Sequence, residues 1–244
     1  MLPTLQRLKV GTLPDNVAAK SIASEWFAQF ARGLEAADVP SILSLLLDDA
    51  FWRDMLALTW EFRTFLGAER ISRFLTDILK SPHVGPGPNA VISNLTLDEG
   101  RIDLQTPYPD LVWIQAAFSF ETSVGLCSGV FRLVPVASGD WKAHVVYTNL
   151  EGLKGYPEKI GELRNMDPIH GDEWKEDRAR EIDFKESEPA VIVIGGGQAG
   201  LEIAARLKYL DVPTLVIERH TRIGDSWRKR YDALSLHDPI CRYF

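Results

Sequence analysis

Cysteine is scarce in this sequence, with Cys127 and Cys241 the only two among 244 residues. Two thiols so far apart favour neither a disulfide framework nor a zinc site. Long apolar runs are also missing: no stretch approaches the roughly 18 residues of a membrane helix, and residues 1–7 lack the apolar core of a secretory signal. Basic residues are not in excess either, because the formal net charge is −7, which argues against nucleic acid as a partner. These absences predict a soluble, cytoplasmic protein without a membrane span.

The first 150 residues divide into a helix-rich part and a strand-rich part. After a tail at 1–17, apolar residues at helical spacing predict three helices: one at 19–34, one from Pro40 that carries Ile42, Leu45 and Leu46, and one at 68–79. A short extended stretch interrupts them. Five segments rich in β-branched and aromatic residues follow, separated by turn formers such as Asp98-Glu99-Gly100: 91–97, 101–106, 111–121, 125–135 and 141–150. Helices followed by an antiparallel meander predict an α+β domain over 18–150, with the helices on one face of a curved sheet.

A charged connector separates this domain from the remainder of the chain. About half of the residues between 151 and 188 are charged, and 172–183 has the composition of a short helix. Such a composition is typical of a solvated linker. We therefore expect limited proteolysis to cut within 151–188 and to leave 18–150 folded.

A dinucleotide-binding fingerprint begins at residue 189. A continuously apolar strand at 190–194 runs into Gly195-Gly196-Gly197-Gln198-Ala199-Gly200, and a helix follows. In a GxGxxG motif the first glycine permits the turn, the second admits a pyrophosphate and the third allows close helix–strand packing. A second apolar strand at 214–217 ends at Glu218, where an acid holds ribose hydroxyls, and an acid disfavours a 2′-phosphate. The fingerprint leaves FAD and NAD equally open.

The residues after Glu218 resemble class B flavin-dependent monooxygenases. The stretch 219–228 carries Gly224-Asp225-Ser226-Trp227 where that family has Gly-Gly-x-Trp, so Asp225 replaces a glycine, and 231–239 is similar to the family's Leu-His-x-Pro stretch. The resemblance implies an NADPH-dependent enzyme that uses FAD to oxygenate a nitrogen, sulfur or carbon atom of a small organic substrate. It also implies an α/β Rossmann-type FAD-binding domain and the following cofactor-binding residues: Gly195, Gly197, Gln198, Ala199, Gly200, Glu218, Arg219, Trp227 and His237. Trp227 and His237 would lie nearer the isoalloxazine ring.

The N-terminal domain resembles the cone-shaped domain of polyketide cyclases and ketosteroid isomerases, called SnoaL-like. The stretches 48–54 and 60–64 carry this resemblance, and fungal flavin monooxygenase-like proteins place such a domain ahead of the FAD domain. The resemblance implies a pocket lined by Asp54, Trp60, Arg63 and His144, and a homodimer formed through this domain. Asp54 is either a proton-abstracting base in that pocket or the structural partner of Arg63. We assign this domain no reaction and leave the catalytic residues open.

Two features of the resembling family are missing from the sequence. There is no second GxGxxG for NADPH, and the family's signature that ends in an aromatic residue between the two glycine motifs is also absent. In addition, 189–244 is short for a doubly wound domain. We therefore expect the chain to be the C-terminally truncated front part of a flavin monooxygenase, inactive and poor at holding FAD by itself. The alternative is a non-catalytic SnoaL-like binding or dimerisation module with a vestigial dinucleotide-binding tail. An NAD-dependent oxidoreductase is a third interpretation.

Overall fold

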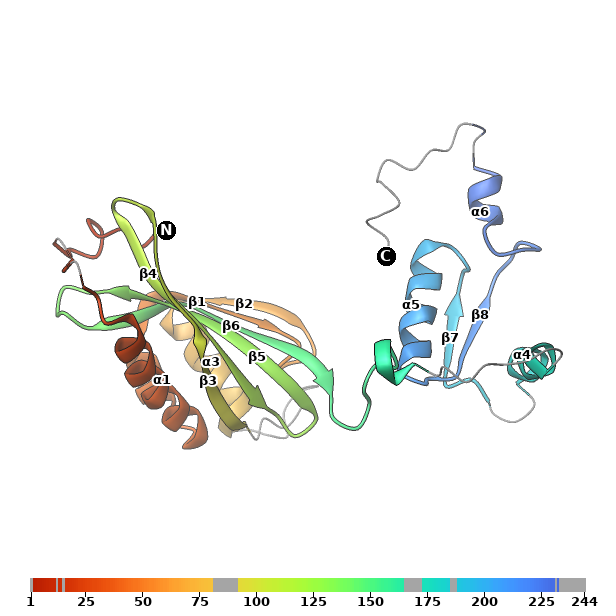
Figure 1. The fold of residues 1–244 in the computed structure, drawn as a ribbon, viewed down its shortest axis with the longest axis horizontal. Coiled ribbons are helices and arrows are strands. Elements are labelled where there is room, and N and C mark those ends of the chain that lie inside the picture. The colour runs from red at the N-terminus through yellow and green to blue at the C-terminus, as the bar shows by residue number, and fades with distance from the viewer. Residues whose placement is uncertain are drawn as a thin grey trace. The chain divides into compact units, whose positions relative to one another are not determined.

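The chain forms two compact units, Met1–Gly155 and Tyr156–Phe244. This computed structural model describes residues 2–11, 13–14, 16–80, 92–164, 173–184, 188–230 and 232 (Figure 1). None of the helices in the described part of the chain is long and apolar enough to cross a membrane.

A six-stranded sheet is the frame of the first unit (Figure 1). Its spatial order is β2-β1-β6-β5-β4-β3, and all neighbours pair antiparallel except β1 and β6, which pair parallel. The predicted antiparallel meander is confirmed in the order β3-β4-β5-β6, and the parallel pairing of β1 with β6 is an addition to it. β1 comes before the meander in sequence and lies beside its last strand, which makes the sheet mixed. The strands are β1 (Leu46–Met55), β2 (Phe62–Leu66), β3 (Ser93–Tyr108), β4 (Leu111–Glu121), β5 (Gly125–Pro135) and β6 (Trp141–Leu153).

The predicted strands at 91–97 and 101–106 are parts of one long strand, β3. Its register against β4 shifts between Asp98 and Asp103, so Asp98-Glu99-Gly100 is an irregularity within a continuous strand and not a turn. The carboxylate of Asp98 accepts a hydrogen bond from the main-chain N–H of Gly100 at 3.1 Å. The sequence Asp98-Glu99-Gly100, whose residue types are usual in turns, is thus accommodated as a local bulge of the strand.

Within the described residues, the first unit has three helices: α1 (Ala19–Glu35), α2 (Val39–Ser44) and α3 (Ala68–Lys80). The second is shorter than predicted, because Leu46 already begins β1. The main-chain oxygen of Leu45 accepts a hydrogen bond from the N–H of Ala143 in β6. The chain therefore joins the sheet at the point where the helix was expected to continue. The short extended stretch between the helices is a complete hairpin of β1 and β2.

Aromatic side chains form the core between the helices and the sheet. Trp26 of α1 stacks on Phe30 with ring centroids 4.8 Å apart and lies 4.5 Å from Phe131 of β5. Trp52 of β1 contacts Phe30 and also Phe74 of α3, so both long helices pack on the same face of the sheet. The predicted fold class, helices on one face of a sheet followed by a β-α-β unit, is confirmed by this arrangement and by the second unit.

The second unit contains a two-stranded parallel sheet of β7 (Val191–Ile194) and β8 (Thr214–Ile217), joined through helix α5 (Gln198–Tyr209) (Figure 1). The short helices η1 (Gly161–Leu163), α4 (Glu173–Asp183) and α6 (Asp225–Arg228) complete it. Apolar side chains stay accessible here: Ile194 is 88% exposed and Ile192 is 56% exposed. Within the described residues, every fully buried apolar side chain belongs to the first unit.

Part of the predicted connector packs on the end of α5. The N–H of Lys159 donates to the carbonyl of Tyr209 at 2.8 Å, the Lys159 ammonium pairs with Asp211, and Glu158 pairs with Arg206 at 3.5 Å. These contacts make residues from Tyr156 onward part of the second unit. Independent folding of 18–150 and cleavage within 151–188 stay predictions.

Candidate functional site

The glycine loop between β7 and α5 is built by two glycines that the backbone requires. Gly195 has φ +105°, a backbone conformation that residues other than glycine rarely adopt. A Cβ on Gly200 would overlap the carbonyl oxygen of Gly195. The first turn of α5 therefore lies directly against the end of β7, as the third glycine of the fingerprint predicts.

Gly197 is different, because the fold does not need a glycine there. Its φ of −80° and ψ of −170° are ordinary extended values, and a Cβ would meet no atom within 4 Å. It is the residue before Gln198, the first residue of α5, and it provides no side-chain cap. The Gln198 side chain turns away to Glu202, at 3.2 Å. The missing side chain leaves room directly in front of the α5 N-terminus, where free N–H groups and the helix dipole favour an anion.

Glu218 is held against the glycine loop. One carboxylate oxygen, Oε2, accepts the N–H of Gly196 at 2.7 Å. The other, Oε1, accepts the N–H of His220 at 2.9 Å and lies 2.7 Å from Nδ1 of its ring. The main-chain bonds from His220 and Gly196 lower the pKa of Glu218 to about 2, against the burial that raises it. The acid is therefore ionised at physiological pH and fixed in orientation. Neither Gly196 nor His220 was predicted as a site residue.

Four further residues were predicted to bind the cofactor, and the structure describes three of them: Ala199, Arg219 and Trp227. Ala199 is in the first turn of α5, and Arg219 is exposed directly after Glu218. Trp227 is half-buried on α6, and no hydrogen bond within the described residues joins its side chain to the glycine loop. His237 lies outside the residues that the structure describes.

Asp225, which stands where the resembling family has glycine, is almost fully buried. Its carboxylate pairs with Arg228 at 3.0 Å and Lys229 at 3.5 Å, and accepts from the Thr221 hydroxyl at 3.3 Å. Burial acts to raise the pKa of Asp225, but these partners lower it. Asp225 is therefore a buried charged centre that links residues of the turn after β8.

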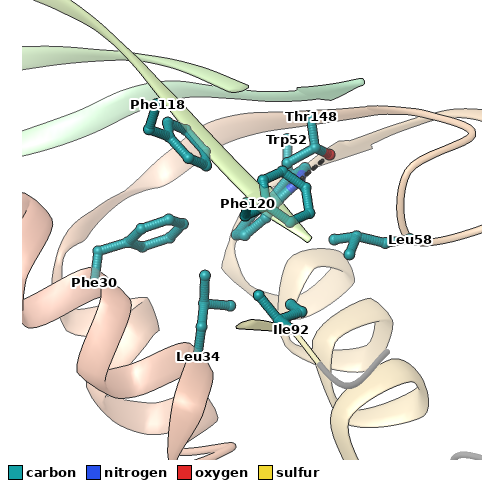
Figure 2. Close-up of a pocket in the computed structure, with 8 residues that line it drawn as sticks. All are labelled: Phe30, Leu34, Trp52, Leu58, Ile92, Phe118, Phe120 and Thr148. Carbon is teal, nitrogen blue, oxygen red and sulfur yellow. Dashed lines mark hydrogen bonds between the residues drawn. The ribbon is translucent and has the colours of Figure 1, made fainter. Parts of the chain in front are cut away.

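The first unit contains a small cavity among aromatic side chains (Figure 2). It has a volume of about 10 Å³, which is room for about one water molecule. Two of its lining residues carry polar groups, and these bond to each other: the Thr148 hydroxyl accepts a hydrogen bond from the Trp52 indole at 3.2 Å. The lining residues come from α1, β1, β4, β6 and the loops: Phe30, Leu34, Trp52, Leu58, Ile92, Phe118, Phe120 and Thr148.

Asp54 lies behind Thr148 and is fully buried. Its carboxylate accepts the Thr148 hydroxyl at 2.7 Å, the N–H of Leu58 at 3.1 Å, and both the N–H and the hydroxyl of Thr59 at 2.9 Å. Burial is the largest influence and raises the pKa of Asp54, against the lowering by these bonds. Both oxygens are engaged by donors that belong to the fold.

In the described part of the chain, the residues of the predicted pocket, Asp54, Trp60, Arg63 and His144, have different surroundings, and the pocket itself stays a prediction. Arg63 faces Asp54 in the β1–β2 register, yet its guanidinium pairs with Glu61 and is half exposed. The predicted Asp54–Arg63 pair is therefore wrong, because main-chain and hydroxyl donors of the 58–59 turn are nearer to the carboxylate. Trp60 is 42% exposed, and His144 is buried with its ring against Phe51.

Comparisons with known proteins find short similarities at the sequence level. No family model matches the chain. A stretch of 49 residues, 20% of this chain, is 45% identical to an uncharacterized oxidoreductase CzcO-like of Geobacillus kaustophilus, and covers 14% of that protein. A stretch of 52 residues, 21% of the chain, is 42% identical to the probable indole-3-pyruvate monooxygenase YUCCA4 of Arabidopsis thaliana, and covers 13% of it. The chain thus spans about one seventh of the length of these curated relatives. It resembles oxidoreductases and monooxygenases over about a fifth of its residues.

Among solved structures, similarity is found over more than half of the chain. A ketosteroid isomerase-like protein of Erwinia carotovora atroseptica matches 56% of this chain and 99% of its own length, with a TM-score of 0.41 and 10% identity. An NTF2-like protein of unknown function from Shewanella baltica matches 57% and 99%, with a TM-score of 0.40 and 16% identity. At these values the likeness carries no information on ligand or activity.

Proposed function

We propose that the second unit binds the adenosine diphosphate half of FAD, and that the chain is part of an NADPH-dependent flavin monooxygenase. Gly197 is the observation that carries the proposal. The backbone there suits any residue and a Cβ would meet nothing, so a glycine at this position serves something other than the fold. A pyrophosphate placed on the α5 N-terminus needs that space.

The residues around the loop fit such a ligand. Gly195 and Gly200 set the turn and the close start of α5, and the N–H groups of Gln198 and Ala199 lie at its positive end. Glu218 is ionised and fixed, as an acid that receives ribose hydroxyls has to be. FAD, when bound, would supply the redox chemistry by which a small organic substrate is oxygenated at nitrogen, sulfur or carbon. Arg219, Trp227 and His237 stay predictions as further FAD-binding residues.

The test measures binding of ADP and of FAD to the purified chain by isothermal titration calorimetry. We expect ADP to bind, and Gly197→Val to weaken it by more than about tenfold, because a branched side chain takes the place of a phosphate. Gly152→Val is the matched control, since a Cβ on Gly152 also meets nothing within 4 Å and its site lies in the first unit. Circular dichroism of both variants should match the parent. Equal affinity of the parent and Gly197→Val for ADP would refute the assignment.

For the first unit we propose a non-catalytic role, which is the part of the alternative interpretation that a specific observation favours. Asp54, its one fully buried carboxylate within the described residues, already accepts four hydrogen bonds from the fold, and the adjacent cavity has room for only about one water molecule. In a form that contains a complete flavin domain, Asp54→Asn should leave kcat for NADPH oxidation within about threefold of the parent. A loss of kcat beyond that, in a variant with unchanged stability, would contradict this role. Self-association through the first unit stays a prediction, which sedimentation velocity would test.

A further inference from the structure

The Glu218 carboxylate is nearly saturated by its own chain. An ionised carboxylate offers about four acceptor positions, and three are taken: one on Oε2 by the Gly196 N–H, and two on Oε1 by the main chain and ring of His220. Because Glu218 is ionised, the ring Nδ1 must carry the proton and donate it. One acceptor position is left, on Oε2.

A ribose brings two neighbouring hydroxyl groups to its acid. The first can donate to the remaining position on Oε2. The second needs Oε1, where both positions are in use. The main-chain N–H of His220 cannot leave without rebuilding the turn after β8, whereas the imidazole can swing away by rotating about its side-chain bonds. Its surroundings permit this, because the His220 side chain is 25% exposed.

We propose that the imidazole of His220 occupies the position on Glu218 Oε1 that one ribose hydroxyl takes, and that a nucleotide binds by displacing it. The inference rests on the proposed nucleotide site and adds a residue that sets its affinity. The main-chain N–H groups of Gly196 and His220 remain on the carboxylate throughout, so Glu218 keeps its orientation while the ring is exchanged for the ligand.

The test compares ADP with 2′-deoxy-ADP on the parent chain, His220→Phe and His220→Ala. Both variants keep the main-chain N–H, and Phe keeps the ring's bulk without its donor. ADP should bind about two- to tenfold tighter to both variants than to the parent, the range for one net hydrogen bond no longer broken on binding. Affinity for 2′-deoxy-ADP, whose single ribose hydroxyl fits on Oε2, should change by less than about twofold.

A second measurement follows the ring in the unmodified chain. The Nδ1 proton, sheltered by its bond to Glu218, should give a low-field NMR signal that ADP abolishes and 2′-deoxy-ADP preserves. Equal or weaker ADP binding to the variants, or a ring signal that ADP leaves unchanged, would overturn the displacement while leaving the nucleotide site standing. No ADP binding to the parent or to either variant would overturn the nucleotide site itself and this inference with it.

Discussion

Removing the Asp54 side chain should destabilise the first unit strongly, whereas neutralising it should not. In Asp54→Ala the main-chain N–H groups of Leu58 and Thr59 lose their acceptor inside the protein. Each orphaned donor costs about 1–3 kcal/mol, and part of the sum is returned because a buried charge disappears. We therefore expect a loss of about 2–4 kcal/mol in the free energy of unfolding.

Asp54→Asn keeps the shape and can keep most of the bonds. Its amide oxygen at the position of Oδ2 still accepts from Leu58 and Thr59, and its NH2 can donate to the Thr148 hydroxyl. The expected loss is less than about 1.5 kcal/mol. Urea unfolding followed by near-UV circular dichroism of the buried Trp26 and Trp52 measures both values. Asp48→Ala, an exposed acid on the same strand, is the control and should stay within about 0.5 kcal/mol of the parent.

The pH dependence gives an independent check on the same residue. Burial raises the pKa of Asp54 above its ordinary 3.8, so the folded unit binds this proton at a higher pH than the unfolded chain. The part of the stability that comes from this bound proton is therefore present below pH 3.8 and is lost as the pH rises through the raised value, whereas the hydrogen bonds that the carboxyl oxygens accept remain. Asp54→Asn should remove this dependence. The reasoning fails if Asp54→Ala costs less than about 1 kcal/mol, or if Asn is as damaging as Ala.

Three further substitutions test other contacts. Gly129→Ala should destabilise the first unit by about 1–3 kcal/mol, because the added Cβ overlaps the ring of Phe118 in the core; Gly152→Ala, measured beside it in urea, should have little effect. Gly200→Ala should expose the amides of α5 to faster hydrogen exchange, since its Cβ overlaps the Gly195 carbonyl, whereas Gly197→Ala should exchange like the parent. Asp225→Gly, which frees Arg228 and Lys229, should speed tryptic cleavage between 222 and 229, and unchanged cleavage would show that this ion cluster does not hold the turn.

Local features of the sequence predicted the fold's local elements well. The glycine loop, the helix after it and Glu218 lie within 24 residues of one another in sequence, from Gly195 to Glu218, and the glycines at Gly195 and Gly200 are explained by the backbone of the loop itself. The contact between Glu218 and His220 is also local, but no sequence pattern marks a histidine two residues after an acid as its partner. This contact depends on the conformation of the His220 side chain, which only the structure shows.

The pairing of strands that are distant in sequence could not be predicted from the sequence. β1 lies beside β6, and the paired residues Trp52 and Val146 are 94 positions apart in the sequence (146 − 52). Neither strand has a sequence pattern that indicates the other as its neighbour. Leu45 and Leu46 continue a helical pattern through the point where the chain becomes a strand, without a turn former between them. For Asp54, the opposite charge across the hairpin suggested Arg63, but several nearby main-chain and hydroxyl donors hold a buried carboxylate more closely than one arginine with access to water.

The parallel pairing of β1 with β6 also has a consequence for synthesis on the ribosome. β1 is made early, but its second neighbour in the sheet is the last strand of the unit, so the sheet can close only after residue 153 has emerged. At about 5–20 residues per second, the nascent chain spends several seconds with α1 made and its sheet incomplete. During that interval Trp26, Phe27 and Phe30 have no β4 or β5 aromatics to pack on. During synthesis, α1 therefore exposes apolar aromatic side chains that a chaperone can bind until β4 and β5 have been made.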